Sequence, residues 1–315
     1  PVARMLINTL QIQNLVIGSG ATLNGNDLDV YVSDTWTNNA GLTGFDAGSG
    51  NTGTTYSIGS RVDISGDTEF NDFVNSANSL YLQANTELFS NDLRNETSIY
   101  TQDNLFHVQG DLVNNVWIYS DLGSLVLDGS DVQYVTSETN SGSATRSRIQ
   151  KITIDNDLGV ELLEYNGKAL IFEVTDEIGL SNGNFSIGDN YLFVYANTSV
   201  TGTGFSKNKM IRTNGRTSSR GIQINYLVGE TFNQYLPIGV SGKFTPVDLN
   251  ITNNGPRGNI VLRAIDAQPS STLPTTYSQD LLEFYWRLFY RPVSGKTIDY
   301  NGSITFYYNQ NDQKK

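Results

Sequence analysis

Apolar and polar side chains alternate along most of this chain in short runs. Runs such as residues 28–32, 125–127 and 192–194 place every second side chain, an apolar one, on the same side of the backbone. A period of two residues predicts β-strands. The runs are separated by about 10 to 20 residues rich in Gly, Asn, Asp and Ser, which are too short and too polar for crossover helices. The strands must therefore pair through turns, which predicts a β-solenoid whose stacked coils share one long core.

The chain also repeats itself at longer range. Residues 26–39 (NDLDVYVSDTWTNN) and 102–115 (QDNLFHVQGDLVNN) align without a gap at an offset of 76 residues, from Asn38 to Asn114, and further matches follow in the same order at offsets of 70 and 79. We therefore predict degenerate super-repeats of about 76–79 residues. The second copy is longer by about nine residues, which we place in a surface loop within residues 137–147. At the coil corners we expect Asn38 and Asn114 to use a left-handed backbone or a hydrogen bond to a neighbouring turn.

Proline separates the last third of the chain from the rest. Pro1 apart, every proline lies after residue 236. Proline has no backbone N–H, so its distribution predicts continuous hydrogen-bonded ladders followed by a looped β-domain. In that domain, residues 278–291 and 304–308 again alternate with a period of two. We expect a solenoid over residues 1–222 and an immunoglobulin-like β-sandwich over residues 223–315.

Composition narrows the classes of function. The chain has no cysteine, one histidine, a net charge of −12 and a pI near 4.5. No disulfide framework can form, and the acidic balance argues against a nucleic-acid partner, because a phosphate backbone needs clustered Lys and Arg. No apolar run approaches the roughly 20 residues of a membrane helix, so we expect no transmembrane segment. The abundance of Asn, Thr, Ser, Gly and Tyr favours an exported protein, and the start at Pro1 predicts a processed or excised piece of a longer chain.

Several phrases carry a resemblance to a known family. They include LVIGSGATLNGNDLDVYVSDTWTNN from Leu15, ISGDTEFNDFVN from Ile64 and YLPIGVSGKFTPVDLNI from Tyr235. These phrases resemble the degenerate repeats of very large secreted surface proteins of Bacteroidota. The resemblance implies a right-handed parallel β-helix followed by a β-sandwich, export through the type IX secretion machinery and an extracellular, cell-surface location, as in adhesins and gliding-associated filaments. The repeats here are less regular, and no sorting domain is recognised before Lys315, so attachment to the cell is implied only by the relatives.

Catalytic chemistry has few candidate residues. His107 is the only imidazole, which leaves almost no room for a nucleophile–histidine triad or a zinc site of the usual kind. Glycoside hydrolysis needs only two carboxyl groups at a defined separation. The candidate pairs for a polysaccharide-degrading β-helix enzyme are Asp128 with Asp131, Asp155 with Asp157, and Glu161 with Glu164. Asp and Asn in the turns are suitable ligands for a structural Ca²⁺ ion, and we expect no other cofactor.

Aromatic and basic residues supply the candidate binding groups. Sugars stack on exposed rings, and the candidates are Trp36, Trp117, Tyr119 and Tyr165, about half of which we expect in the core. A basic stretch at the junction with the second domain contains Lys207, Lys209, Arg212, Arg216 and Arg220. Residues 1–145 hold 17 acids and three bases. The basic stretch is therefore expected to clamp onto acidic coils, in the same molecule or in a neighbouring copy.

The favoured interpretation is a non-catalytic module of an exported cell-surface adhesin or filament. It would act as a rigid stalk or display scaffold, and its partners would be cell-surface or extracellular glycans or neighbouring copies of the same chain. One alternative is the polysaccharide-degrading enzyme. A second is a phage or injection-system fibre that binds a host receptor, which trimerisation in solution would favour.

Overall fold

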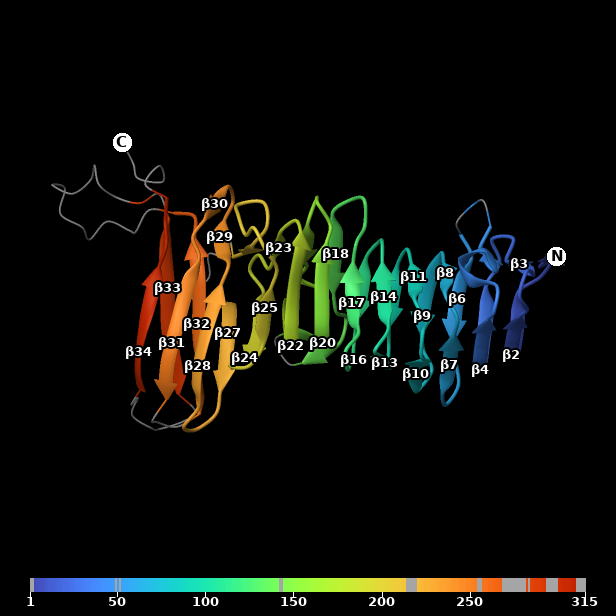
Figure 1. Cartoon of the computed structure of the whole chain (residues 1–315), viewed down its shortest axis with the longest axis horizontal. Helices are drawn as coiled ribbons and strands as arrows, with labels where there is room; N and C mark the ends of the chain where they lie inside the picture. Colours follow the sequence, from blue (N-terminus) through green and yellow to red (C-terminus); the bar gives the residue numbers. More distant parts are fainter. Residues whose placement is uncertain are drawn as a thin grey trace.

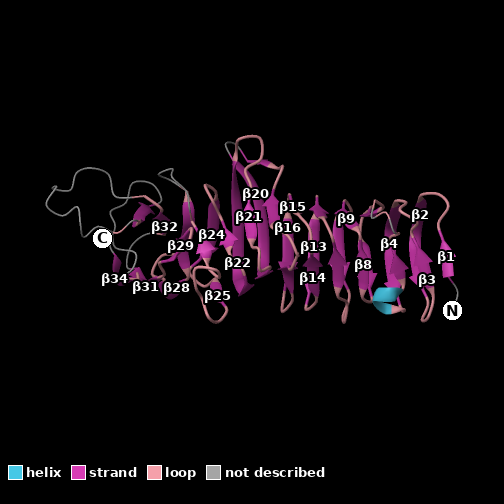
Figure 2. Ribbon diagram, turned by 90° about the horizontal axis from the view of Figure 1, so that it is seen from above, coloured by secondary structure: helices cyan, strands magenta, loops and turns pink. Residues whose placement is uncertain are grey.

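The strands stack along one axis into a β-solenoid of about nine turns (Figure 1). The computed structural model describes residues 3–48, 50, 52–141, 144–213, 220–253, 257–267, 282, 284–292 and 300–309. Within these residues the one helix is a 3₁₀ turn at Gly41–Thr43, and Figure 2 shows strands joined by loops along the rest of the axis. The predicted all-β solenoid is confirmed.

Three parallel ladders, which we call faces A, B and C, run along the solenoid. Each coil contributes one strand to each face, and the long strands β2 (Leu10–Ile17) and β4 (Val30–Asn38) each serve face A with their first half and face B with their second half. Face A continues through β6 (Thr54–Ser57), β9 (Asp72–Asn75), β12 (Leu93–Asn95), β15 (Leu112–Asn114), β18 (Gln133–Thr136), β21 (Val160–Leu162), β23 (Phe185–Ser186), β26 (Ile211–Arg212) and β29 (Ile238–Val240), which pairs with β30 (Lys243–Phe244).

Faces B and C share two long strands in the middle of the molecule, β20 (Ala144–Asp155) and β22 (Ala169–Asn182). Face B further contains β7 (Val62–Ser65), β10 (Ser79–Leu82), β13 (Ser98–Gln102), β16 (Trp117–Ser120), β24 (Tyr191–Tyr195) and β27 (Gly221–Tyr226). Face C further contains β1 (Ala3–Met5), β3 (Thr22–Asn24), β5 (Phe45–Asp46), β8 (Thr68–Phe70), β11 (Leu88–Ser90), β14 (Leu105–Val108), β17 (Ser124–Leu127) and β25 (Ser199–Thr201).

The structural repeat is one coil. On face A, Val32 lies opposite Ser57, and the ladder then continues to Asn75, Asn95 and Asn114, in steps of 25, 18, 20 and 19 residues. The 76-residue echo aligned Asn38, at the end of a face B segment, with Asn114, at the end of a face A strand. These two residues are not structurally equivalent, because the corners between strands vary in length while the strands keep their pairing.

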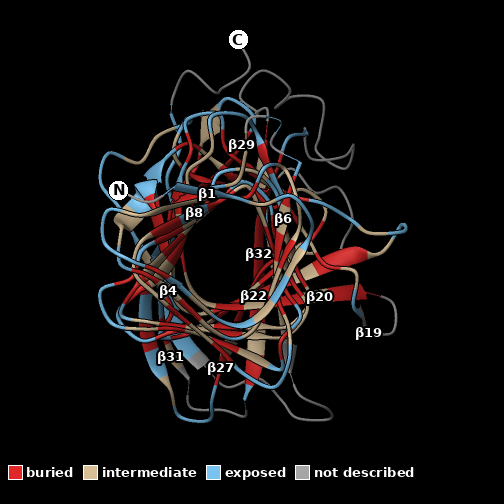
Figure 3. Ribbon diagram, turned by 90° about the vertical axis from the view of Figure 1, so that its right-hand side faces the viewer, coloured by how far each residue is buried: buried red, intermediate tan, exposed pale blue. Residues whose placement is uncertain are grey.

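The core consists of aliphatic ladders that run parallel to the axis. On face B the inward side chains of Val62, Leu80, Ile99, Ile118 and Ile149 stack on one another and are at most 1% exposed. Figure 3 looks along the axis and shows buried segments around the interior. Each buried aliphatic side chain stabilises the fold by roughly 1.5–3 kcal/mol, which makes the stacking of coils the main source of stability.

A ladder of buried polar side chains runs from coil to coil at the ends of the face A strands. Ser57 Oγ donates to Asn75 Oδ1 (2.7 Å), Asn75 Nδ2 to Asn95 Oδ1 (2.8 Å), Asn95 Nδ2 to Asn114 Oδ1 (2.7 Å) and Asn114 Nδ2 to Ser147 Oγ (2.8 Å). The three asparagines are fully buried. We call this chain of bonds the asparagine ladder. It locks the axial register of five successive coils, since a shift of one residue would leave buried amides without partners.

The asparagine corners differ from the expectation in one respect. The expected hydrogen bonds to neighbouring turns are present, and Asn38 Nδ2 likewise donates to the carbonyl oxygen of Asp67 (2.8 Å). The left-handed backbone is not used by Asn38 or Asn114, whereas Asn26, Asn85 and Asn166 do have positive φ angles. Asparagine occupies these corners because its amide both donates and accepts, so it can bridge two coils at once.

The predicted insertion projects from the side of the solenoid. Its residues form β19 (Asn140–Ser141), which pairs with the start of β20 in an antiparallel hairpin that stands out in Figure 3. Arg94, two coils earlier on face A, donates to both carboxylate oxygens of Glu138 at the base of this hairpin (3.1 and 2.5 Å). The insertion is therefore a surface feature anchored to the coils, as expected.

The C-terminal strands form an antiparallel extension of the solenoid sheet and a separate antiparallel three-stranded sheet. The extension contains β27, β32 (Gly258–Ile265) and β33 (Tyr285–Pro292), and the separate sheet contains β28 (Thr231–Leu236), β31 (Val247–Asn253) and β34 (Tyr300–Phe306). Rings join the two sheets, with Trp286 and Phe306 centred 4.9 Å apart. The other edge of β27 pairs in parallel with β24, and the buried residues of both parts belong to one cluster. The expected boundary at 222/223 falls inside β27, and an immunoglobulin-like sandwich is not confirmed.

Replacing Asn95 by alanine should lower the free energy of unfolding by about 2–3 kcal/mol, because it removes two buried hydrogen bonds and leaves the side-chain oxygen of Asn114 without its donor. Chemical denaturation followed by circular dichroism measures this change. Asn91 is the matched control, since it lies on the same coil but is exposed. Asn91→Ala should change the free energy by less than about 0.5 kcal/mol. Equal losses in the two variants would contradict a special role for the ladder.

Candidate functional site

Trp36 is a core residue. Its side chain is 1% exposed, its indole N–H donates to Thr68 Oγ1 (3.2 Å), and its ring packs edge-on against Phe45 and Phe70 with centroids 5.1 and 5.0 Å away. The prediction that Trp36 binds sugars is therefore wrong. Trp36 lies in the second half of β4, where the alternation turns Trp36 and Asn38 inward.

Trp117 and Tyr119 are half-buried on the outer side of face B. They belong to a column of rings in which Tyr81 stacks on Tyr100 (4.4 Å), Tyr100 on Tyr119 (4.8 Å) and Tyr119 beside Trp117 (5.3 Å). The guanidinium of Arg148 lies 4.8 Å from the centre of the Trp117 ring. We call this column the face B stack. A sugar stacks on an open ring face, and here the neighbouring rings and Arg148 already occupy those faces, so the stack mainly supports the coils.

Tyr165 lies apart from these rings. It is half-buried in the turn between β21 and β22, and this turn is closed by two backbone hydrogen bonds with Lys168 (3.0 and 2.9 Å). The predicted role of Tyr165 in sugar binding stays a prediction.

The first carboxylate pair is divided between two environments. Asp128 Oδ2 lies 2.7 Å from Nδ1 of His107, whose ring stacks on Phe89 at 4.4 Å. Asp131 is exposed, and its backbone carbonyl accepts a hydrogen bond from Asn156 Nδ2 (2.7 Å). Asp128 is thus paired with His107, whereas Asp131 lies on the surface in the turn that follows Asp128.

The pair of Glu161 and Glu164 is held by the basic stretch. Glu161 lies 2.8 Å from Arg212, and Glu164 lies 2.7 Å from Arg220, which also contacts Asp189 at 3.3 Å. The predicted clamp thus forms within one molecule, although its acids lie in residues 161–189 rather than in residues 1–145. Each glutamate is paired with a different arginine, an arrangement that suits a structural role better than a shared hydrolytic site.

The remaining predicted groups lie elsewhere. Lys209 Nζ donates to the carbonyl oxygen of Ser181 (3.1 Å), and Arg216 lies outside the described residues. In the described part of the chain, no three carboxylate or imidazole groups come together as metal ligands. The calcium site therefore stays a prediction without a location.

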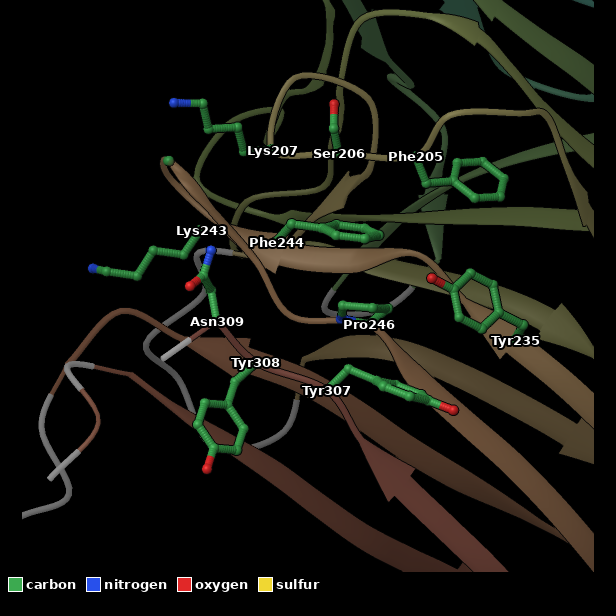
Figure 4. Close-up of a pocket in the computed structure, with 11 residues that line it drawn as sticks. Phe205, Ser206, Lys207, Tyr235, Lys243, Phe244, Pro246, Tyr307, Tyr308 and Asn309 are labelled. Carbon is green, nitrogen blue, oxygen red and sulfur yellow. The ribbon is translucent and has the colours of Figure 1, made fainter. Parts of the chain in front are cut away.

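A groove at the C-terminal end of the molecule brings together aromatic residues that are far apart in sequence. It has a volume of about 710 Å³. We call it the C-terminal groove. Its lining residues are Phe205, Ser206, Lys207, Tyr235, Gly242, Lys243, Phe244, Pro246, Tyr307, Tyr308 and Asn309. In Figure 4, Phe205 and Phe244 lie on one side of Pro246, and Tyr307 and Tyr308 on the other.

Local backbone structure places these rings. The turn that carries Phe205 is closed by reciprocal backbone hydrogen bonds between Ser206 and Lys209 (3.1 and 2.9 Å). Gly242 has a φ of +74°, which a tight turn between β29 and β30 requires and which presents Phe244 to the groove. The N–H of Tyr307 donates to the carbonyl of Pro246 (3.0 Å), which fixes the chain after β34 against the opposite wall.

The groove rings have open faces, unlike the face B stack. Tyr235, Tyr307 and Tyr308 are 40%, 46% and 48% exposed. Phe205 and Tyr235 are 6.1 Å apart and tilted by 34°, so they border a space without stacking on each other. Such faces can accept the apolar side of a sugar ring, while the phenol groups, Ser206 and Asn309 supply hydrogen bonds.

The polar groups of the groove are neutral or positively charged. Burial raises the pKa of the Tyr235 hydroxyl, and the neighbouring Tyr307 and Asp248 add to this shift, so the phenol stays protonated and can donate a hydrogen bond at neutral pH. Lys243 pairs with Asp266 at 3.1 Å, and Lys207 is exposed at the rim. In Figure 4 both lysine side chains extend from the same end of the groove.

Sequence reasoning missed this groove, although one signal was available. Phe306, Tyr307 and Tyr308 are three consecutive aromatic residues at the end of an alternating strand. Alternation cannot turn three neighbours to the same side, so at least one ring had to face solvent. The other lining residues come from separate segments that only the fold brings together.

Comparison with protein-family models, with curated proteins and with solved structures found no significant match. The resemblance to the Bacteroidota surface proteins is therefore still a prediction. Within the described residues, no helix has the length and apolar character needed to cross a membrane.

Replacing Glu164 by glutamine should lower the free energy of unfolding by about 0.5–1 kcal/mol at low salt and by almost nothing at high salt, because it breaks a partly exposed ion pair. Denaturation at two salt concentrations measures both values. Asp131→Asn is the control, since Asp131 is exposed and makes no ion pair in the described structure; it should have no effect. A loss for Glu164→Gln that salt leaves unchanged would contradict the clamp.

Proposed function

We propose that the chain is a non-catalytic glycan-binding module of an exported cell-surface adhesin or filament. The solenoid serves as a rigid stalk, and the C-terminal groove binds the sugar. The single observation that carries this proposal is the set of open aromatic faces in the groove at the end of a continuous stack of coils. With the resemblance to the Bacteroidota proteins, the proposal includes right-handed winding, a C-terminal β-sandwich, type IX export and an extracellular location.

The composition of the groove favours a carbohydrate. Protein sites for small ligands have volumes of about 300–1,000 Å³ and combine aromatic walls with a few polar groups. The C-terminal groove, at about 710 Å³, lies within this range. Five of its lining residues are aromatic, and its polar groups are hydroxyls, an amide and two lysines. This mixture suits a ligand with apolar ring faces and many hydroxyl groups.

The same groove favours binding over cleavage. None of the described residues that line it is acidic or a histidine. Hydrolysis of a glycosidic bond needs two carboxyl groups beside the scissile bond. The carboxylates considered for that chemistry include Asp128 beside His107 and Glu161 and Glu164 beside Arg212 and Arg220. The proposal therefore assigns them structural roles.

The solenoid suits the role of a stalk. Parallel ladders join every coil to the next, and in the described structure the ladder of face B continues from β2 to β27 without a break. A bend would require neighbouring coils to separate their hydrogen bonds and their buried ladders together. A ligand bound in the groove is thus held at a fixed place at one end of an elongated body (Figure 1).

A panel of polysaccharides should retain the protein without being cut. In each tube one measures the protein held on the glycan and the reducing or unsaturated ends released. The double change Tyr307→Ala and Tyr308→Ala should weaken retention about tenfold or more, because each ring buried against a ligand contributes about 1.5–3 kcal/mol. Tyr134→Ala is the matched control, since Tyr134 is a 37% exposed tyrosine on β18 outside the groove.

Other outcomes would identify the alternatives. Release of new chain ends at catalytic rates would contradict the proposal in favour of a polysaccharide-degrading enzyme. Retention that Tyr134→Ala weakens as much as the groove variant would contradict the assignment to the groove. A threefold molecular mass in solution would favour a phage or injection-system fibre. No retention on any glycan would leave a spacer whose partner is a protein.

A further inference from the structure

A buried carboxylate on the outer side of face B organises two arginines. Glu173 projects from β22 and is 3% exposed, although it lies on the outward side of its strand. Its Oε2 is 2.8 Å from Arg146 Nη2 and 3.0 Å from Arg148 Nε, and its Oε1 accepts a hydrogen bond from the Tyr195 hydroxyl (2.6 Å). Both guanidinium groups thus converge on one oxygen atom. We call this set of four residues the Glu173 cluster.

The Glu173 cluster has an excess of positive charge. It contains two guanidinium groups and one carboxylate. Burial raises the pKa of Tyr195 to about 12, and the hydrogen bond and negative charge of Glu173 contribute to this shift. The hydroxyl is therefore neutral at physiological pH, and the cluster keeps a net charge of about +1 within a chain whose net charge is −12.

The two arginines retain donors that Glu173 does not use. A guanidinium group has five N–H donors, and each of these arginines contacts Glu173 through one nitrogen atom. The Nε of Arg146 is buried, but the side chains of Arg146 and Arg148 are 33% and 32% exposed, so the other donors at the ends of the two guanidinium groups can reach a ligand. Glu173 and the ring of Trp117 hold Arg148 in place, which reduces the entropy lost when an anion binds.

Two other arginines on the outer faces of the solenoid lack this excess. Arg61 forms a bidentate pair with Asp63, and Arg94 contacts both Glu96 and Glu138. At these places each guanidinium has at least one carboxylate to itself. The Glu173 cluster differs because two cations share one carboxylate, which is the charge balance expected of an anion site.

We propose that Arg146 and Arg148 bind the anionic group, a carboxylate or a sulfate, of an acidic polysaccharide. The two fork-shaped guanidinium groups suit such groups, which accept two parallel hydrogen bonds. In the face B stack, Tyr81, Tyr100 and Tyr119 follow the axis. Trp117, on the same strand as Tyr119, contacts Arg148, so a chain lying along face B would reach the cluster. This site is independent of the C-terminal groove and adds a second, charge-selective contact to the proposed stalk.

Titration calorimetry with three polymers tests the site: polygalacturonate carries carboxylates, dextran sulfate carries sulfates, and dextran is neutral. The wild type should bind at least one polyanion, with an affinity that falls as salt rises. The double change Arg146→Gln and Arg148→Gln should weaken this binding about tenfold or more. Arg61→Gln is the matched control, because it also removes a face B arginine that lies over a tyrosine ring; it should leave binding unchanged.

Glu173→Gln separates binding from a purely structural role. This change keeps the shape of the side chain and removes its negative charge, so the net charge of the cluster rises to about +2 and polyanion binding should tighten severalfold, even if the unfolding midpoint falls. The Tyr307 and Tyr308 variant should bind polyanions normally, which distinguishes this site from the groove. Absence of polyanion binding by the wild type, equal weakening by Arg61→Gln, or unchanged affinity in Glu173→Gln would overturn the proposal.

Discussion

The register between neighbouring coils is the constraint on which the rest of the structure depends. Parallel backbone pairing places each inward side chain directly over its equivalent in the preceding coil, so the aliphatic ladders and the asparagine ladder require the same alignment. The aliphatic ladders supply most of the stabilising free energy and tolerate some variation in side chain. The asparagine ladder is selective, because a slipped coil would bury unpaired amides. One register therefore satisfies both, and variation is confined to the corners.

The outer surface follows from this register. Rings and charges on equivalent positions are brought within contact distance of each other, which produces the face B stack and the pairing of Glu173 with Arg146 and Arg148. The same geometry uses up most of these groups in contacts between coils. Aromatic rings with open faces remain in the C-terminal groove, where the regular stacking of coils ends. Guanidinium groups with unused donors remain in the Glu173 cluster, where the positive and negative charges do not balance. The proposed binding functions lie at these two places.

The amino-acid pattern predicted the solenoid, because alternation with a period of two and polar turns leave few other ways to bury the apolar residues. It also predicted that the basic stretch would pair with acidic coils, but it placed the acids in residues 1–145, whereas Arg212 and Arg220 pair with acids in residues 161–189. It did not predict the length of each coil, because corner residues carry no periodic signal, and the 76-residue echo therefore paired Asn38 with Asn114. The partners of Glu173 and the walls of the groove depend on register and on chain crossings that local patterns do not encode.

Hydrogen–deuterium exchange along the axis tests most directly whether the coils and the C-terminal sheets form one continuous stack. The account predicts the greatest protection in the central coils that carry the asparagine ladder, and protection that continues from β22 and β24 into β27 and β32 without a step. Faster exchange is expected in the first coil, where Leu10 and Ile12 are only partly buried. If β27 and β32 exchanged together but independently of β24, the groove would lie on a separate unit, and the rigid-stalk account would be contradicted.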